Sequence, residues 1–137
     1  MTASGQTISG DSIGPKFVHI VSGRAVVLTE PLCFLAVNTK NGTIEDRFHP
    51  QNGHNVSGAI LLLPGSRGGG ATPDQLCETV RAGVGPAAIV LKAPDPALAV
   101  GAYVAGILYG IQTPVIVVNA KTYESIRYGD PISVSSI

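Results

Sequence analysis

A glycine-rich stretch after residue 64 holds side chains and backbone groups suited to binding an anion. It lies between an apolar run and the expected start of a helix, so its N–H groups precede the positive end of a helix dipole. An arginine adds a planar fork for carboxylate or phosphate, and two hydroxyls lie nearby. The residues concerned are Ser66, Arg67, Gly68, Gly69, Gly70 and Thr72.

This loop matches neither of the common nucleotide-binding signatures. A P-loop needs GxxxxGK[ST], and a dinucleotide-binding turn needs GxGxxG with a ribose-binding acid further along the chain. Neither pattern is present. The sequence therefore favours an anion-binding loop of another kind. The alternative is a plain connection whose glycines only permit a tight turn.

His49 and His54 share the polar loop 48–55. A proline follows His49 and fixes its place, so this residue is the candidate for acid–base catalysis; a hydrogen-bonded structural histidine is the alternative. Cys33 and His49 would together form a nucleophilic pair, whereas the default for Cys33 and Cys77 is a buried, inert thiol. Because no further ligand has metal-site spacing, no metal site is expected.

Alternating strands and helices in the second half of the chain must position the glycine loop. Continuous apolar runs predict strands buried on both faces, and a cap residue followed by proline predicts each helix start. Such alternation implies a parallel sheet with ligands at the carboxyl ends of its strands. The predicted elements are a strand at 59–63, a helix from Thr72 to near Gly83, a strand at 87–91, a helix from Asp95 to Tyr109, and a strand at 115–118.

The first half of the chain is predicted to be rich in strands, and no linker or repeat divides the sequence. Residues 1–14 are expected to form a flexible segment ahead of one α/β domain at 15–137. Asn41-Gly42 is a turn signal, because both residue types tolerate positive φ. The other predicted segments are strands at 16–20, 22–28, 30–37, 43–46 and 132–134, and a polar turn at 123–130.

The 137 residues are 45% hydrophobic and 13% charged, with 9 basic and 9 acidic side chains. This balance excludes a disordered chain and predicts no binding to nucleic acid or to an anionic membrane. The uncharged stretch 96–120 is interrupted by Gly110–Pro114, so it is expected to be a helix, a turn and a strand rather than a membrane span. Two cysteines without a CxxC pair indicate a reducing, cytoplasmic location. A neutral surface favours association with a partner or with a second copy of the chain.

Short motifs spread along the chain occur in a recognisable order. They are Pro31-Leu32-Cys33-Phe34, Asn41-Gly42, His49-Pro50, the segment from Gly53 to Gly58, Pro64-Gly65-Ser66-Arg67-Gly68, the segment from Gly85 to Val90 and the segment from Gly101 to Ala105. Together they resemble the small subunit, or swivel domain, of aconitase X. That group is similar to archaeal phosphomevalonate dehydratase and bacterial cis-3-hydroxy-L-proline dehydratase. The resemblance covers residues 14–134 and depends on the order and spacing of the motifs.

The resemblance implies a swivelling β/β/α domain that closes over a larger partner, fused or separate, whose own cysteines hold an iron–sulfur cluster. Two cysteines are too few for a self-contained cluster, so no cofactor is expected on this chain. The implied reaction removes water from a hydroxy acid or a phosphorylated hydroxy acid. The implied roles are substrate-anion binding by Arg67 and proton abstraction by a serine of the same loop.

This chain departs from the family at that serine. The family loop is Arg-Gly-Ser, whereas the chain has Arg67-Gly68-Gly69. Ser66 or Thr72 would therefore have to take the role of the missing hydroxyl. Two further pocket positions that are commonly serine and aspartate in the family are Cys33 and Asn38 here.

Three functions follow as alternatives. The favoured one is the small subunit of an aconitase-X-type hydro-lyase. The second is a stand-alone swivel domain that isomerises or cyclises a small organic molecule without a cluster, using an apolar pocket lined by Phe34, Leu35 and Val37. The third is a non-catalytic assembly subunit, whose complex would keep its turnover when Arg67 is replaced.

Overall fold

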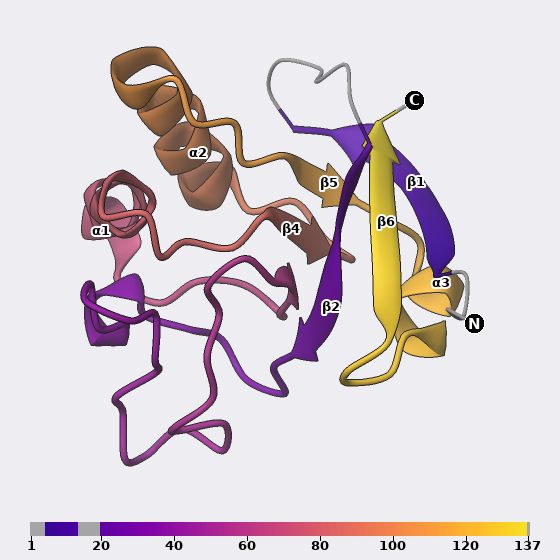
Figure 1. Cartoon of the computed structure of the whole chain (residues 1–137), viewed down its shortest axis with the longest axis horizontal. Helices are drawn as coiled ribbons and strands as arrows, with labels where there is room; N and C mark the ends of the chain where they lie inside the picture. The colour runs from indigo at the N-terminus through magenta and orange to yellow at the C-terminus, as the bar shows by residue number, and fades with distance from the viewer. Residues whose placement is uncertain (1–4, 14–19, 137) are drawn as a thin grey trace.

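The computed structural model describes residues 5–13 and 20–136 (Figure 1). Its elements, in chain order, are β1 (Gln6–Ser12), β2 (Val21–Val27), the 3-10 turn η1 (Phe34–Ala36), β3 (Ile60–Leu62), the 3-10 turn η2 (Gly69–Ala71), α1 (Thr72–Arg81), β4 (Ala88–Leu91), α2 (Pro96–Tyr109), β5 (Val115–Val117), α3 (Ala120–Ser125) and β6 (Pro131–Ser136). None of the helices in these two ranges has the length and apolar character that a membrane span requires.

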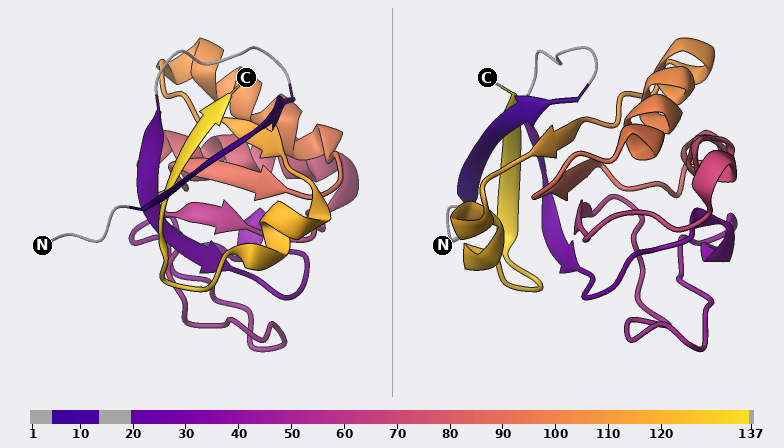
Figure 2. Two further views of the ribbon diagram at one scale, coloured as in Figure 1. Left: turned by 90° about the vertical axis from the view of Figure 1, so that its right-hand side faces the viewer. Right: turned by 180° about the vertical axis from the view of Figure 1, so that it is seen from behind.

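The strands close into a barrel in the order β1-β5-β4-β3-β2-β6 (Figure 2). β2, β3, β4 and β5 are parallel neighbours, which confirms the parallel sheet expected from the strand–helix alternation. β6 pairs parallel with β1 and antiparallel with β2, and β1 pairs antiparallel with β5. The sheet is therefore mixed, because the first and last strands supply the antiparallel pairs that close it.

The central strands are buried on both faces and divide the hydrophobic interior into two clusters. Ile60 and Leu62 of β3 belong to a cluster drawn from all six strands, inside the barrel. Leu61 belongs to a second cluster, which includes residues of α1 and α2. All three side chains are fully buried. The continuous apolar run at 59–63 is thus confirmed as a strand covered on both sides.

α1 and α2 pack side by side on one side of the barrel, across from β1 and β6 (Figures 1 and 2). They approach closely at Gly101, where an added Cβ would lie 2.9 Å from the carbonyl oxygen of Pro73. Asp95 caps α2 by accepting a hydrogen bond from the Leu98 N–H at 3.2 Å, and Gly110 ends the helix at φ +68°. Both ends of α2 confirm the prediction.

Two helix starts differ from the prediction. The N-cap of α1 is Ala71 rather than Thr72, and no side chain caps it. The Thr72 hydroxyl instead donates to the Arg67 carbonyl at 3.3 Å, which ties the helix to the glycine loop. The start of the predicted polar turn at 123–130 belongs to α3, because the Asn119 side chain caps a helix there.

The N-terminal segment is part of the barrel and is not a flexible extension. β1 pairs with both β5 and β6, and its Ile8 is only 2% exposed within the barrel cluster. Two ladders and a buried side chain thus give residues 6–12 a place in the barrel. The predicted strand at 16–20 lies, apart from Ile20, outside the described residues.

The connection between β2 and β3 is less regular than predicted. Residues 30–37 contain η1 in place of a strand, and residues 43–46 make only isolated bridges, such as the one between Val37 and Ile44. The turn at Asn41-Gly42 is confirmed, since the glycine has φ +81°. This connection runs beside the glycine loop, where Leu32 forms a bridge with Ser66. Its contacts with the loop form part of the candidate site.

Candidate functional site

The glycine loop runs beside the segment that follows β2, and backbone hydrogen bonds tie the two together. The Leu32 N–H donates to the Gly65 carbonyl at 3.1 Å, and the Arg67 N–H donates to the Leu32 carbonyl at 2.9 Å. The loop follows β3, so it lies at the carboxyl edge of the parallel strands, where the sequence predicts a ligand site. The pairing brings residues 30–33 alongside the loop.

Ser66 is held by Asp95, which follows the neighbouring strand β4. One carboxylate oxygen of Asp95 accepts from the Ser66 N–H at 2.8 Å and from the Ser66 hydroxyl at 2.9 Å. The other oxygen caps α2. The carboxyl ends of two adjacent parallel strands thus meet at a hydroxyl–carboxylate pair, in which the carboxylate can accept the hydroxyl proton.

The Arg67 guanidinium lies at the surface and pairs with Glu30. The Nη2 atom is 3.4 Å from Glu30 Oε1, and the two side chains are 54% and 47% exposed. Ion pairs this exposed contribute about 0–1 kcal/mol. Arg67 can therefore exchange the Glu30 carboxylate for the anionic group of a ligand at little cost.

The three glycines after Arg67 leave both space and hydrogen-bond donors open. Gly68 and Gly69 have φ of +123° and +54°, values that favour glycine. No atom lies within 4 Å of a Cβ placed on Gly69 or Gly70. In the part of the chain that the structure describes, none of the three N–H groups donates a hydrogen bond. They offer free donors at the start of α1, beside the arginine.

Cys33 and Gln75 flank the loop at Gly68. The Cys33 thiol donates to Gln75 Oε1 at 3.5 Å, and a Cβ on Gly68 would lie 3.0 Å from that oxygen and 3.8 Å from the sulfur. Cys33 is half-buried, so the structure brings it to the loop, as the resemblance implies. Thr72, by contrast, is fully buried. Its hydroxyl holds the loop from within and has no open side for the predicted catalytic role.

His49 supports the fold instead of facing the loop's open side. It is 4% exposed. Its Nδ1 accepts from the Gln51 N–H at 3.0 Å, which makes Nε2 the donor to the Glu30 carbonyl at 3.2 Å. Both ring nitrogens are therefore engaged in hydrogen bonds within the fold, and neither is bonded to Cys33; the catalytic role of His49 stays a prediction. Its contact fixes the backbone of the residue that pairs with Arg67.

Asn38 belongs to the neighbouring turn. Its side-chain amide donates to Glu45 Oε2 at 3.0 Å, and its side-chain oxygen accepts from the Lys40 N–H at 2.8 Å. Both polar ends of the side chain therefore stabilise the turn, and the substrate contact of Asn38 stays a prediction.

The apolar pocket predicted around η1 does not form. Phe34 and Val37 are buried, at 1% and 3% exposed, in the cluster shared with α1 and α2. Leu35, between them, is 76% exposed. These side chains lie on opposite sides of the short turn, so they cannot line one cavity.

Both cysteines are free thiols. Burial raises the pKa of the Cys77 thiol, and the nearby Asp74 and Glu78 add to the effect. In residues 5–13 and 20–136, no group of three or more His, Cys, Asp or Glu side chains is placed to bind a metal. An iron–sulfur cluster needs four ligands, so the residues present do not fit one.

Glu30, Gln75 and the loop-holding role of Asp95 escape prediction from the sequence. Asp95 carries a usable signal, because it follows a buried strand that a parallel sheet places next to the strand before the loop. Glu30 carries no such signal. Because residues 30–37 are predicted to be a strand, the sequence does not indicate that this segment runs along the glycine loop. Gln75 is recognisable only as a residue of the first helical turn.

Known proteins resemble the chain over most of its length. The model of the aconitase X swivel domain matches residues 15–137. A cis-3-hydroxy-L-proline dehydratase from Pseudomonas aeruginosa is 36% identical over 92 residues, which make up 67% of this chain and 16% of that protein. A phosphomevalonate dehydratase small subunit from Methanothermobacter thermautotrophicus is 36% identical over 86 residues, or 62% of this chain and 66% of that subunit. The match thus spans less than two-thirds of either relative.

A solved structure shares the fold. Aconitase X from Thermococcus kodakaraensis, in its holo form, superimposes with a TM-score of 0.74 at 21% identity, covering 91% of this chain and 88% of that chain. This likeness confirms a mixed α/β fold of the aconitase X swivel type. With the match of the domain model to residues 15–137, it follows that the chain belongs to the aconitase X swivel-domain family.

Proposed function

We propose that the chain is the small, swivelling subunit of an aconitase-X-type dehydratase. Its substrate is a hydroxy acid or a phosphorylated hydroxy acid. The relatives are named for dehydration of cis-3-hydroxy-L-proline and of phosphomevalonate, and both compounds combine a hydroxyl with an anionic group. A larger subunit carries the iron–sulfur cluster, for which this chain lacks ligands. Two free thiols favour a reducing, cytoplasmic location.

The observation that carries the proposal is the set of free donors at the glycine loop. The exposed Arg67 guanidinium precedes three N–H groups, at Gly68, Gly69 and Gly70, that have no partner within the described residues. Charge-assisted hydrogen bonds are about twice as strong as neutral ones, and the dipole of α1 has the favourable sign for an anion. A loop that served only as a connection would have no need for this set of donors.

Ser66 takes the role of the family serine in this proposal. Its hydroxyl is bonded to Asp95 at 2.9 Å, whereas Gly69 has no side chain and Thr72 is buried. Asp95 orients the hydroxyl and can take its proton as Ser66 takes one from the substrate. This relay moves one proton onto Ser66 and one off it, so the hydroxyl is regenerated in the same step.

The first test is the mass and iron content of the protein purified from its native host. A complex of this chain with a larger polypeptide, showing iron–sulfur absorbance, is expected. An iron-free monomer or homo-oligomer contradicts the proposal and favours a swivel domain detached from dehydratase chemistry.

The second test replaces the loop arginine. Arg67→Ala should reduce kcat/KM of the complex about 10- to 100-fold, because a hydrogen bond to a charged group contributes about 1.5–3 kcal/mol. Arg81→Ala is the matched control, since Arg81 lies exposed in the last turn of α1 and pairs with Glu78. Equal activity in both variants would exclude the loop as the anion site and favour a non-catalytic assembly role.

A further inference from the structure

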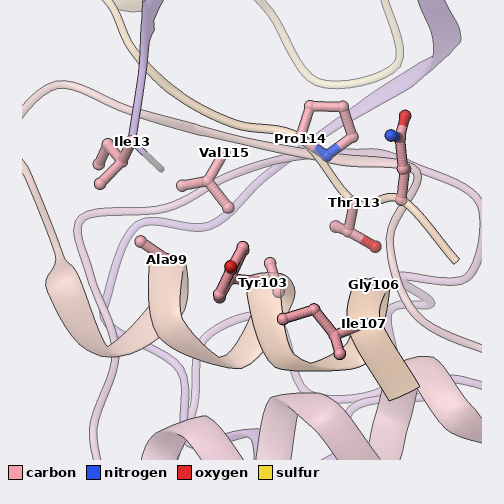
Figure 3. A pocket seen from close by; sticks show the side chains of 10 residues that line it. Ile13, Ala99, Tyr103, Gly106, Ile107, Thr113, Pro114 and Val115 are labelled. Atoms are coloured by element: carbon pink, nitrogen blue, oxygen red, sulfur yellow. The ribbon is translucent and has the colours of Figure 1, made fainter. Parts of the chain in front are cut away.

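α2 and the start of β5 enclose an apolar cavity of about 220 Å³ (Figure 3). Tyr103 and Ile107 extend from α2 into this groove, with Gly106 and two alanines beside them. Thr113 and Val115 line the opposite side. The groove is thus a hollow between a helix and a strand, bordered by two large side chains and widened by small ones.

The surface around this groove is apolar and uncovered. Ile107 and Tyr103, which line the groove, are 64% and 49% exposed. Leu108 and Val100, elsewhere on α2, are 61% and 49% exposed. Of the ten large hydrophobic side chains exposed in the described residues, six lie between positions 100 and 111. No charged residue occurs from 96 to 120. Such a concentration of exposed apolar side chains is typical of a surface that another molecule covers.

The cavity fits the side chain of a protein better than it fits a substrate. Pockets for organic ligands commonly enclose about 300–1,000 Å³ and contain a few placed polar groups. This cavity is smaller, and its described lining contains no Asp, Glu, Lys, Arg or His. An anionic substrate would find no positively charged partner there. One inserted Leu, Phe or Met would fill it, as anchor side chains do at the centre of protein interfaces.

The groove runs along α2 from Ala99 to Ile107 and on to the amino end of β5, whereas the glycine loop meets the helix only at its N-terminus. Asp95, which holds the loop, is at the N-terminus of the helix. Residues 112–115 enter β5 at its amino end, after the helix has finished. A partner seated in the groove therefore contacts the amino edge of the parallel strands and leaves the loop at the carboxyl edge free to meet substrate.

We propose that this groove is where the larger dehydratase subunit docks, inserting an apolar side chain between Tyr103 and Ile107. The inference rests on the proposed function, and the relatives identify the occupant. In the Pseudomonas protein the matched region is 16% of the polypeptide, so the equivalent domain is joined to a much larger chain, and the archaeal relative is named a small subunit. A domain that swivels over substrate needs one lasting contact away from its substrate loop, and the groove provides it.

The test uses the affinity-tagged chain expressed in its native host. Ile107→Glu places a charge at the groove, and Gly106→Leu fills the cavity without a charge, since an added Cβ there meets only the Ile111 carbonyl at 3.7 Å. Phe48→Glu is the matched control, because Phe48 is 81% exposed on the connection between β2 and β3. Circular dichroism checks that each variant folds. The complex is quantified by light scattering and by the iron–sulfur absorbance of the larger subunit.

Wild type and Phe48→Glu should hold the larger subunit in a one-to-one complex, and both groove variants should weaken it by about 30-fold or more. Retention of the complex by both groove variants overturns the docking site and leaves the proposed function standing. A self-association of this chain that Ile107→Glu abolishes also overturns it, because the occupant is then a second copy. Failure of wild type to bind any iron–sulfur subunit refutes the proposed function itself.

Discussion

The two ends of α2 present opposite chemistries. Near its N-terminus, Asp95 holds Ser66 through two hydrogen bonds, and Arg67 lies exposed nearby. Toward its C-terminus, Tyr103 and Ile107 border a cavity whose described lining has no charged side chain. The polar end is built from directional hydrogen bonds between segments far apart in sequence. The apolar end is built from the packing of two consecutive elements.

This difference separates recognition of a small anion from recognition of a protein. The loop depends on free donors and on backbone freedom at Gly68 and Gly69, which a packed surface does not allow. The groove depends on exposed apolar area, which would bind an anion poorly. If the two ends serve separate tasks, a substitution at one end should leave the task of the other end intact.

The largest expected effect comes from restoring the family hydroxyl at the polar end. Gly69→Ser has room for its side chain, but φ of +54° costs about 1 kcal/mol for a residue with a Cβ. Dehydratase activity of the complex should rise, by at most about 10²-fold, because Ser66 lies on the other side of Arg67 from the family position and replaces that serine only in part. Gly70→Ser, with equal room and no positive φ, is the control. Kinetics in which both variants match wild type would show that Ser66 fills the role as completely as a serine at position 69 would.

A second pair of variants tests how much the stability depends on the close packing of α1 against α2. Gly101→Ala places a Cβ 2.9 Å from the Pro73 carbonyl oxygen, so it should push α1 from α2, cost about 1–3 kcal/mol and disturb loop and groove together. Gly106→Ala places a Cβ 3.7 Å from the Ile111 carbonyl oxygen, an ordinary van der Waals contact, and should add about 0.5–1 kcal/mol of stability. Urea unfolding measures both. Equal stabilities would mean that the helices can separate at no cost.

Sequence reasoning predicts the apolar end more completely than the polar end. The stop of α2 at Gly110 and the strand at 115–118 are both local signals, and each is confirmed. Cap chemistry and hydrophobic runs act within a few residues, so they can be recognised without knowing the fold. The exposed face of α2 is harder to recognise, because an all-apolar helix does not show which side is covered.

The polar end depends on contacts between distant segments. Glu30 meets Arg67 only because the chain after β2 runs along the loop, and His49 is buried only because that same connection folds back onto Glu30. The strand predicted at 30–37 hides this path. The strand at Gln6–Ser12 is missed by sequence reasoning for a related reason. It is stabilised by pairing with β5 and β6, and pairing between distant segments leaves no local signal.

Replacing Asp95, which holds Ser66 in the glycine loop, is expected to have an intermediate effect on activity and stability. Asp95→Asn keeps an oxygen that can cap Leu98, but loses the charge that holds Ser66, so stability should fall by about 1 kcal/mol and kcat/KM by roughly tenfold. Asn119→Asp is the reverse exchange at the cap of α3 and should leave both unchanged. Both variants should still bind the larger subunit at the groove. If Asp95→Asn also releases the larger subunit, the two ends of α2 are coupled and the separation argued above fails.

The smallest effect is expected at the exposed ion pair. Glu30→Gln removes the carboxylate that lies 3.4 Å from Arg67, and freeing the guanidinium should tighten binding of inorganic phosphate about two- to threefold, within the range of exposed pairs. Glu78→Gln, which frees Arg81 in the same way, should leave phosphate binding unchanged. Calorimetric titration distinguishes these outcomes. Weaker binding in Glu30→Gln would mean that Glu30 orients the arginine and does not compete for it. The carboxylate would then act with the backbone contact from His49 to hold the guanidinium ready for substrate.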